Sequence, residues 1–149
     1  MPKKTLDEYQ VESRDFLLAD NFRLLADEPG VGKTGPAIMA GWELLDRGKD
    51  GSPPVLITAP AYLLPNWEKE IHDFLPTASV VLADGTGVRS RSDSLASDAD
   101  FVLTSYNNWS AKETIKTKLG NYQGDYQYPQ LVQHKWTAYI FDEGHRLRG

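Results

Sequence analysis

A glycine-rich run ending in Lys-Thr, DEPGVGKT at residues 27–34, constrains the fold of this chain more than any other stretch. Gly30 and Gly32 allow the backbone to take positive φ values and to turn its N–H groups inward. Lys33 can reach β- and γ-phosphate oxygens, and the Thr34 hydroxyl can bind Mg²⁺. These residue types in this order predict a phosphate-binding loop.

The surroundings of this loop favour the same interpretation. An apolar, strand-like run at residues 22–26 precedes it and a helix-like run at residues 37–45 follows it, which is the setting that a phosphate-binding loop requires. Asp27 stands where the usual pattern G-x-x-x-x-G-K-[ST] has its first glycine. An ordinary glycine turn is the alternative reading of the same residues.

Composition predicts one globular domain covering residues 1–149. The chain is 40% hydrophobic and 25% charged, and no apolar run approaches the roughly 18 residues that cross a bilayer. Lys3 and Lys4 are not followed by the apolar core of a signal peptide, and the absence of cysteine excludes disulfides and thiolate metal sites. We expect no membrane partner and an intracellular location, cytoplasmic or nucleoid-associated.

The net charge of −5 argues against a broadly basic surface. Contact with a nucleic acid would therefore use a local basic stripe or backbone amides. Positive residues cluster at residues 112–118 and again at Arg146 and Arg148, although short clusters of this kind are also typical of solvated faces.

Strand-like and helix-like segments alternate along the chain, which predicts an α/β fold with a mainly parallel sheet and helices on both faces. The expected strands are short apolar runs ended by polar or turn residues, at residues 22–26, 55–58, 80–82, 101–104 and 138–141. The expected helices have apolar residues at helical spacing, at residues 6–18, 34–47 and 64–75.

Two aromatic features fall outside this scheme of strands. Trp42, in the second expected helix, is predicted to pack in the core. Residues 120–129 carry three tyrosines among glycine and glutamine and are predicted to form a surface loop held to the domain by those tyrosines. A partner-binding or base-stacking loop is the alternative.

Acidic side chains follow the last expected strand directly, as Asp142 and Glu143. A carboxylate at the carboxyl end of a parallel strand lies at the sheet edge where ligands bind. Asp142 can hold Mg²⁺ through water there, and Glu143 can orient or deprotonate an attacking water. A solubilising strand cap is the alternative for this pair, and His145 is compatible with a purely structural role.

Together these motifs resemble the first RecA-like lobe of superfamily-two helicases, and most closely the Swi/Snf-type DNA translocases. DEPGVGKT is similar to the family's motif I, and DEGHRLR at residues 142–148 is similar to motif II. Gln10 falls in a segment resembling the adenine-recognising Q-motif. Segments at residues 58–70 and 104–106 resemble motifs Ia and Ib.

The resemblance implies a three-layer RecA-like fold, ATP and Mg²⁺ as ligands, and DNA as a partner contacted through its backbone. Lys33, Asp142 and Glu143 would be catalytic. The nucleotide would also contact Gln10 of the Q-motif and four residues of the phosphate loop, namely Asp27, Gly30, Gly32 and Thr34. Candidate DNA contacts are Thr58, Thr104 and Ser105. Trp67 fits motif Ia, but its helical spacing predicts a core residue first.

The resemblance stops after motif II, so the family's motif III strand and its second lobe have no counterpart in these 149 residues. We therefore expect an incomplete lobe. A second RecA-like lobe in a longer chain or in a separate polypeptide would complete it, or the sheet would be rearranged. The competing function is a non-catalytic module that binds nucleotide, DNA or a partner protein. A GTPase or small-molecule kinase is disfavoured, because the chain has no Asn-Lys-x-Asp motif.

Overall fold

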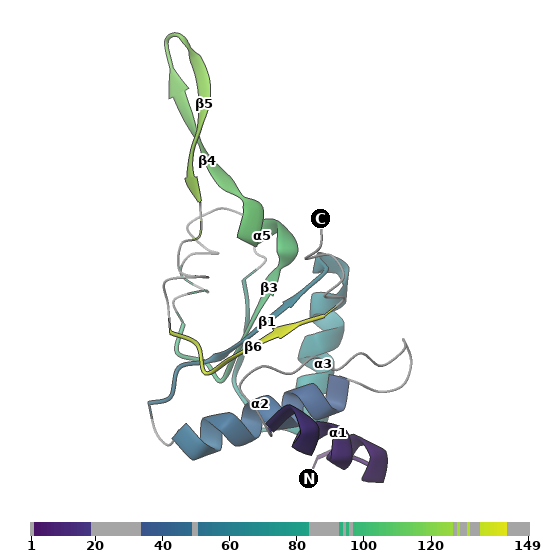
Figure 1. Ribbon diagram of the computed structural model, residues 1–149. Coiled ribbons are helices and arrows are strands. Elements are labelled where there is room, and N and C mark those ends of the chain that lie inside the picture. The colour runs from purple at the N-terminus through teal and green to yellow at the C-terminus, as the bar shows by residue number, and fades with distance from the viewer. Residues whose placement is uncertain are drawn as a thin grey trace.

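The computed structural model describes residues 2–18, 34–48, 51–83, 97–126 and 135–142, together with residues 93, 95, 128 and 131. In these residues four α-helices, one 3-10 turn and six strands form one parallel sheet with its covering helices and one projecting hairpin (Figure 1). In chain order the elements of the described part are α1 (Glu8–Leu18), α2 (Thr34–Gly48), β1 (Val55–Ala59), η1 (Ala61–Leu63), α3 (Leu64–Phe74), β2 (Val80–Leu82), β3 (Phe101–Ser105), α5 (Tyr106–Ser110), β4 (Lys112–Thr117), β5 (Gly120–Tyr126) and β6 (Ala138–Phe141).

Four of the five expected strands form the main sheet, in the order β2-β3-β1-β6, and every neighbouring pair is parallel. Val55 of β1 is aligned with Phe101 on one side and with Ala138 on the other. All residues of β1 and β3 are buried, which explains why both strands are unbroken apolar or small-residue runs. The fifth expected strand, at residues 22–26, lies outside the described residues.

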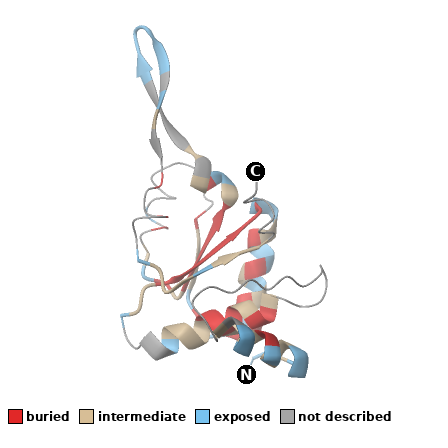
Figure 2. Ribbon diagram, viewed as in Figure 1, coloured by how far each residue is buried: buried red, intermediate tan, exposed pale blue. Residues whose placement is uncertain are grey.

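Both faces of the sheet are covered, so the expected layered α/β architecture is confirmed. Alternate residues of β1 enter two separate apolar clusters, because successive side chains of a strand point to opposite faces. Ile57 packs with α2 and α3, whereas Leu56 packs with Leu95, Tyr128 and other residues on the opposite face. Figure 2 shows the buried strands at the centre and the exposed outer faces of the helices.

The three expected helices are also present. α3 is amphipathic and buries Leu64, Trp67, Ile71 and Phe74 along one side, with a proline in its first turn. Trp42 of α2 is partly buried and stacks on Phe101 with ring centroids 6.4 Å apart. Trp42 thus belongs to the core, as expected, and lies at the edge of the apolar cluster.

The prediction of a surface loop at residues 120–129 is wrong for most of that stretch, because β5 pairs with β4 in an antiparallel hairpin. β4 contains two threonines and an isoleucine and β5 contains two tyrosines, and these residue types favour extended structure. The turn uses Lys118 and Leu119 rather than Asn-Gly, and Thr117 closes it by donating from its hydroxyl to the carbonyl of Gly120 at 2.8 Å. Gly120 has φ of 139°, a conformation that favours glycine.

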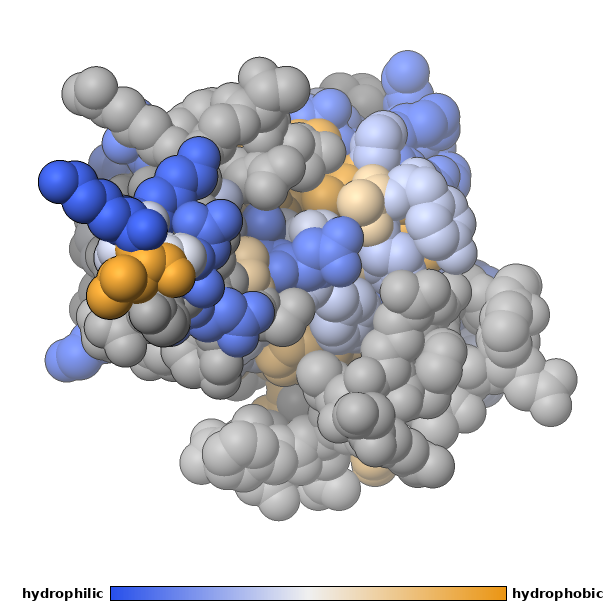
Figure 3. Space-filling view, turned by 90° about the horizontal axis from the view of Figure 1, so that it is seen from above, coloured by the Kyte–Doolittle hydropathy of each residue, from blue (hydrophilic) through white to orange (hydrophobic). Residues whose placement is uncertain are grey.

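The hairpin projects from the end of the sheet at which β3 runs into α5 (Figure 1). Its described tip residues, 116–121, are exposed and include Lys116 and Lys118. Viewed onto this end, the coloured part of the surface is mainly hydrophilic with small separate apolar patches (Figure 3). Tyr128, just beyond β5, is 2% exposed, so at least this tyrosine attaches the segment to the domain as expected.

Candidate active site

A pocket of about 310 Å³ lies at the N-terminus of α2 and brings two predicted nucleotide contacts together, Gln10 and Thr34. α2 is 15 residues long, and its N-terminal end presents the positive pole of the helix dipole, which favours bound phosphate. The full lining comprises Lys4, Thr5, Gln10, Thr34, Gly35, Asn66, Glu70 and Phe74. This cavity combines a position suited to phosphate with side chains that can bind a polar ligand.

Gln10 also caps helix α1. Its backbone N–H donates to Oδ1 of Asp7 at 2.8 Å, and the backbone N–H of Asp7 donates to Oε1 of Gln10 at 3.1 Å. This reciprocal pair is a capping box with Asp7 as the N-cap residue. The pattern Asp7-x-x-Gln10 is visible in the sequence, but the sequence analysis did not use it. Recognition of adenine by Gln10 stays a prediction.

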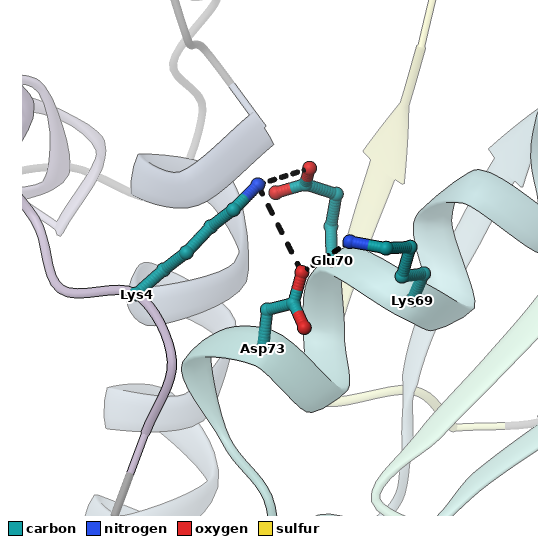
Figure 4. Close-up of polar contacts among 4 residues, drawn as sticks. All are labelled: Lys4, Lys69, Glu70 and Asp73. Carbon is teal, nitrogen blue, oxygen red and sulfur yellow. Dashed lines mark hydrogen bonds and ion pairs between the residues drawn. The ribbon is translucent and has the colours of Figure 1, made fainter.

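An ion-pair network that the sequence did not reveal includes two lining residues of the pocket, Lys4 and Glu70, and continues to Asp73 and Lys69 (Figure 4). Lys4 Nζ lies 2.6 Å from Oε1 of Glu70 and 3.9 Å from Oδ2 of Asp73, and Lys69 Nζ donates to the same Asp73 oxygen at 2.7 Å. The hydrogen bond from Lys69 holds the pKa of the Asp73 carboxyl below its usual range. The backbone N–H groups of Lys3 and Lys4 both donate to the Asp73 carbonyl, so the N-terminal segment is bound to α3.

Asp142 directly follows β6, at the carboxyl end of the parallel sheet, as predicted. Its backbone N–H donates to the carbonyl of Thr58 at 2.8 Å, which extends the pairing of β6 with β1. The indole Nε1 of Trp67 donates to Oδ2 of Asp142 at 2.9 Å, and the Tyr106 hydroxyl donates to the Asp142 carbonyl. Asp142 is therefore held by groups from three elements of the fold.

Trp67 is a core residue, as its helical spacing predicts, and it has a polar partner as well. It is 4% exposed and belongs to the apolar cluster beneath α3, so the core prediction is confirmed. The same side chain reaches Asp142, which is 75 positions away along the chain. Helical spacing could reveal the burial of Trp67 but not its polar partner.

The three candidate DNA contacts lie at the carboxyl ends of β1 and β3, and all three residues are buried. Thr58 is 0% exposed and its Oγ1 accepts from Trp109 Nε1 at 3.0 Å. Thr104 is also 0% exposed and its Oγ1 accepts from Asn108 Nδ2 at 2.8 Å. In this structure both hydroxyls hold side chains of α5, and their contact with DNA stays a prediction.

Ser105, the third candidate, lines a second pocket of about 310 Å³ at the same edge of the sheet. One wall comes from Pro60 and η1 and the other from the start of α5, and the lining residues are Pro60, Ala61, Tyr62, Ser105, Tyr106 and Asn107. Tyr62 is 71% exposed there. Segments resembling motifs Ia and Ib thus meet at one open surface.

The remaining site predictions concern residues outside the described part of the chain, namely Asp27, Gly30, Gly32, Lys33, Glu143 and His145. Among the described residues there is no group of three or more histidine, aspartate or glutamate side chains that could hold a metal. The two predicted Mg²⁺ ligands, Thr34 and Asp142, offer a hydroxyl and a carboxylate, and oxygen donors of this kind suit Mg²⁺. Neither described ligand conflicts with a magnesium site.

The parallel sheet in the order β2-β3-β1-β6, covered on both faces and followed by an acid at the carboxyl end of β6, has the architecture expected of a RecA-like lobe. The fold is similar to that of a solved SWI2/SNF2 ATPase core from Sulfolobus solfataricus, in complex with dsDNA, with a TM-score of 0.73. The sequences are 23% identical, and the match covers 99% of this chain and 28% of that chain, so this likeness concerns the fold.

The chain belongs to the SNF2-related domain family, which matches residues 9–149. It is 33% identical to the ATP-dependent helicase brm of Drosophila melanogaster over 99% of its own length and 8% of that protein. It is 32% identical to the CHD3-type chromatin-remodeling factor CHR7 of Arabidopsis thaliana over 97% of its own length and 12% of that protein. The predicted Swi/Snf resemblance is thereby confirmed, and the chain corresponds to a small part of each relative.

Within the described ranges, none of the helices combines the length and the apolar character needed to cross a bilayer.

Proposed function

We propose that this chain is the ATP-binding lobe of a Swi/Snf-type helicase or DNA translocase, which couples ATP hydrolysis to movement on DNA. The observation that carries the proposal is the pocket at the N-terminus of α2, where Gln10 and Thr34 lie together. α3 connects this pocket to Asp142, because Asn66 lines the pocket and Trp67, the next residue, binds the Asp142 carboxylate. Membership of the SNF2-related domain family supports the same reading.

In this proposal each site residue has one task. Lys33 contacts the β- and γ-phosphates from the phosphate-binding loop, which Asp27, Gly30 and Gly32 help to shape. Thr34 and Asp142 hold Mg²⁺, which neutralises charge on the phosphates when it is bound. Glu143 orients or deprotonates the attacking water. Gln10 contacts the adenine base.

DNA would lie along the edge of the sheet that carries the second pocket. Ser105 lines that pocket and can reach a phosphate directly, since backbone contacts commonly use hydroxyls and amides. Thr58 and Thr104 would contribute indirectly, because their hydroxyls hold the side chains of Trp109 and Asn108 through hydrogen bonds. Contacts of this kind are independent of base sequence and are compatible with an acidic chain. A protein acting on genomic DNA would work inside the cell, in the cytoplasm or at the nucleoid.

Hydrolysis would need a partner lobe, in a longer chain or in a separate polypeptide. In related nucleotide hydrolases an arginine brought to the γ-phosphate accelerates the reaction by roughly 10³–10⁵-fold. Such arginines come from the second lobe in the family that this chain resembles. We therefore propose that these 149 residues bind Mg²⁺ and ATP but turn ATP over slowly by themselves.

Turnover measured with and without the partner lobe tests this proposal. ATP hydrolysis in the presence of duplex DNA is followed for the 149-residue chain and for the same lobe joined to a second RecA-like lobe. We expect DNA-stimulated turnover only from the two-lobe protein, with a difference of roughly 10³-fold or more. Rapid hydrolysis by the single lobe would contradict the proposal that catalysis needs groups from both lobes. No DNA-stimulated hydrolysis by the two-lobe protein would favour a non-catalytic binding module.

A further inference from the structure

Asp142 is bound at two different atoms by two elements that do not belong to its own strand. Trp67, in the first turn of α3, donates from Nε1 to the carboxylate at 2.9 Å. Tyr106, the first residue of α5, donates from its hydroxyl to the Asp142 carbonyl. The Tyr106 ring also lies against Phe141, with centroids 6.5 Å apart. Side chain and backbone of Asp142 are thus oriented independently.

The chemistry of the indole suits a carboxylate that must bind a cation. Indole Nε1–H is a neutral donor and has no accepting capacity. It can therefore fix the plane of a carboxylate without cancelling its negative charge, whereas a lysine or arginine in the same place would compete with Mg²⁺. Trp67 is 4% exposed and packed in the apolar cluster, so its ring is held in one orientation.

Of the two helices whose side chains bind Asp142, α5 borders the second pocket directly and α3 follows the η1 turn that borders it. Tyr106 lines that pocket itself, and Tyr62, on the η1 turn that leads into α3, forms part of its other wall. Asn66 lines the nucleotide pocket immediately before Trp67 in the sequence. The first turn of α3 therefore lies between the two pockets and contacts Asp142.

We infer that Trp67 is a positioning residue for Asp142, and that Tyr106 is a second one acting on the backbone of the same residue. This inference rests on the proposed function, because it assigns Asp142 to the Mg²⁺ site. Donors that orient a metal-binding carboxylate typically contribute 10–100-fold to metal affinity. Tyr106 also lines the second pocket.

The matched pair Trp67→Phe and Trp42→Phe tests the role of Trp67. Each change removes one indole, but Trp67 donates to Asp142 whereas Trp42 stacks on Phe101. In the presence of saturating ATP, we expect the Mg²⁺ concentration at half-saturation to rise by about tenfold or more in Trp67→Phe. It should stay within about twofold in Trp42→Phe, and ATP binding in the absence of Mg²⁺ should be the same in both.

Indole ¹H–¹⁵N resonances give a readout that does not depend on Mg²⁺ or ATP. The chain has four tryptophans, and Trp67→Phe identifies the signal of Trp67. We expect Asp142→Ala to move that signal and Asp142→Asn to move it less, because an amide oxygen still accepts the bond. Tyr106→Phe, which removes one hydroxyl, serves as the second variant should Trp67→Phe not fold, and it too should weaken Mg²⁺ binding.

The outcomes separate this inference from the proposed function. An indole signal of Trp67 that ignores Asp142→Ala, or unchanged Mg²⁺ affinity in both Trp67→Phe and Tyr106→Phe, would overturn the positioning role alone. Failure of the wild-type chain to bind Mg²⁺ with ATP would overturn the proposed function and, with it, the assignment of Asp142.

Discussion

Gln10 takes part in two features of the structure at once, and the neighbouring Asp7 takes part in only one of them. Both residues form the capping box of α1, and Gln10 alone lines the pocket that contains Thr34. A glutamine whose carbonyl oxygen is already bound has a defined orientation, which lowers the entropy lost on contacting a ligand. The observed cap and the proposed contact with the base would then be two uses of one side chain.

Asp7→Ala and Gln10→Ala separate these two uses. Loss of either half of the capping box should lower the free energy of unfolding by about 1 kcal/mol. Only Gln10→Ala should also weaken ATP binding, by roughly twofold to tenfold for one lost hydrogen bond. Thermal unfolding and calorimetric titration of the two variants check this directly. Equal losses of ATP affinity would show that Gln10 acts only through the helix.

The role of a residue could be predicted where it depends on neighbours along the chain. It could not be predicted where it depends on residues that are distant in the sequence. Trp67 was predicted as a core residue from its spacing, but its bond to Asp142 joins residues that only the folded sheet brings together. Lys4 is likewise 66 positions from Glu70. In contrast, the pair Lys69 and Asp73 has i,i+4 spacing and could have been found.

Buried helices and strands could be predicted from the sequence more readily than exposed ones. β1 and β3 are buried throughout and read as apolar runs, so their prediction needed no knowledge of their partners. The β4–β5 hairpin was missed because its apolar residues are few and its turn lacks the usual Asn-Gly signal. Within the described structure, no other element makes an extensive contact with either hairpin strand.

This isolation predicts that the hairpin unfolds separately from the sheet. Gly120→Ala forces a side chain into a backbone of φ 139°, which should cost about 1–3 kcal/mol at the turn. Amide exchange in β4 and β5 should accelerate by roughly tenfold or more, whereas exchange in β1 and β3 should stay unchanged. Asn121→Ala, at the next position, is the control. Equal acceleration in the core strands would mean that hairpin and sheet form one cooperative unit.

For the whole molecule, the sequence indicated the family, the parallel sheet and the place of Asp142 at the carboxyl end of β6. Those features follow from local runs and motifs, and the family match over residues 9–149 confirms the family. What local patterns could not supply is how the two candidate pockets are connected. In the structure η1 contributes Tyr62 to the second pocket and runs directly into α3, which contributes Asn66 to the first.

Calorimetric titration of the 149-residue chain with ATP and Mg²⁺ tests the central claim that this lobe binds ATP through its phosphate loop. Lys33→Ala removes the predicted phosphate contact, and Lys135→Ala, at an exposed position, is the matched control. Because a hydrogen bond to a charged group contributes about 1.5–3 kcal/mol, we predict saturable binding that weakens by at least about tenfold in Lys33→Ala only. Unchanged affinity in Lys33→Ala, or no binding by the wild-type chain, would contradict the account.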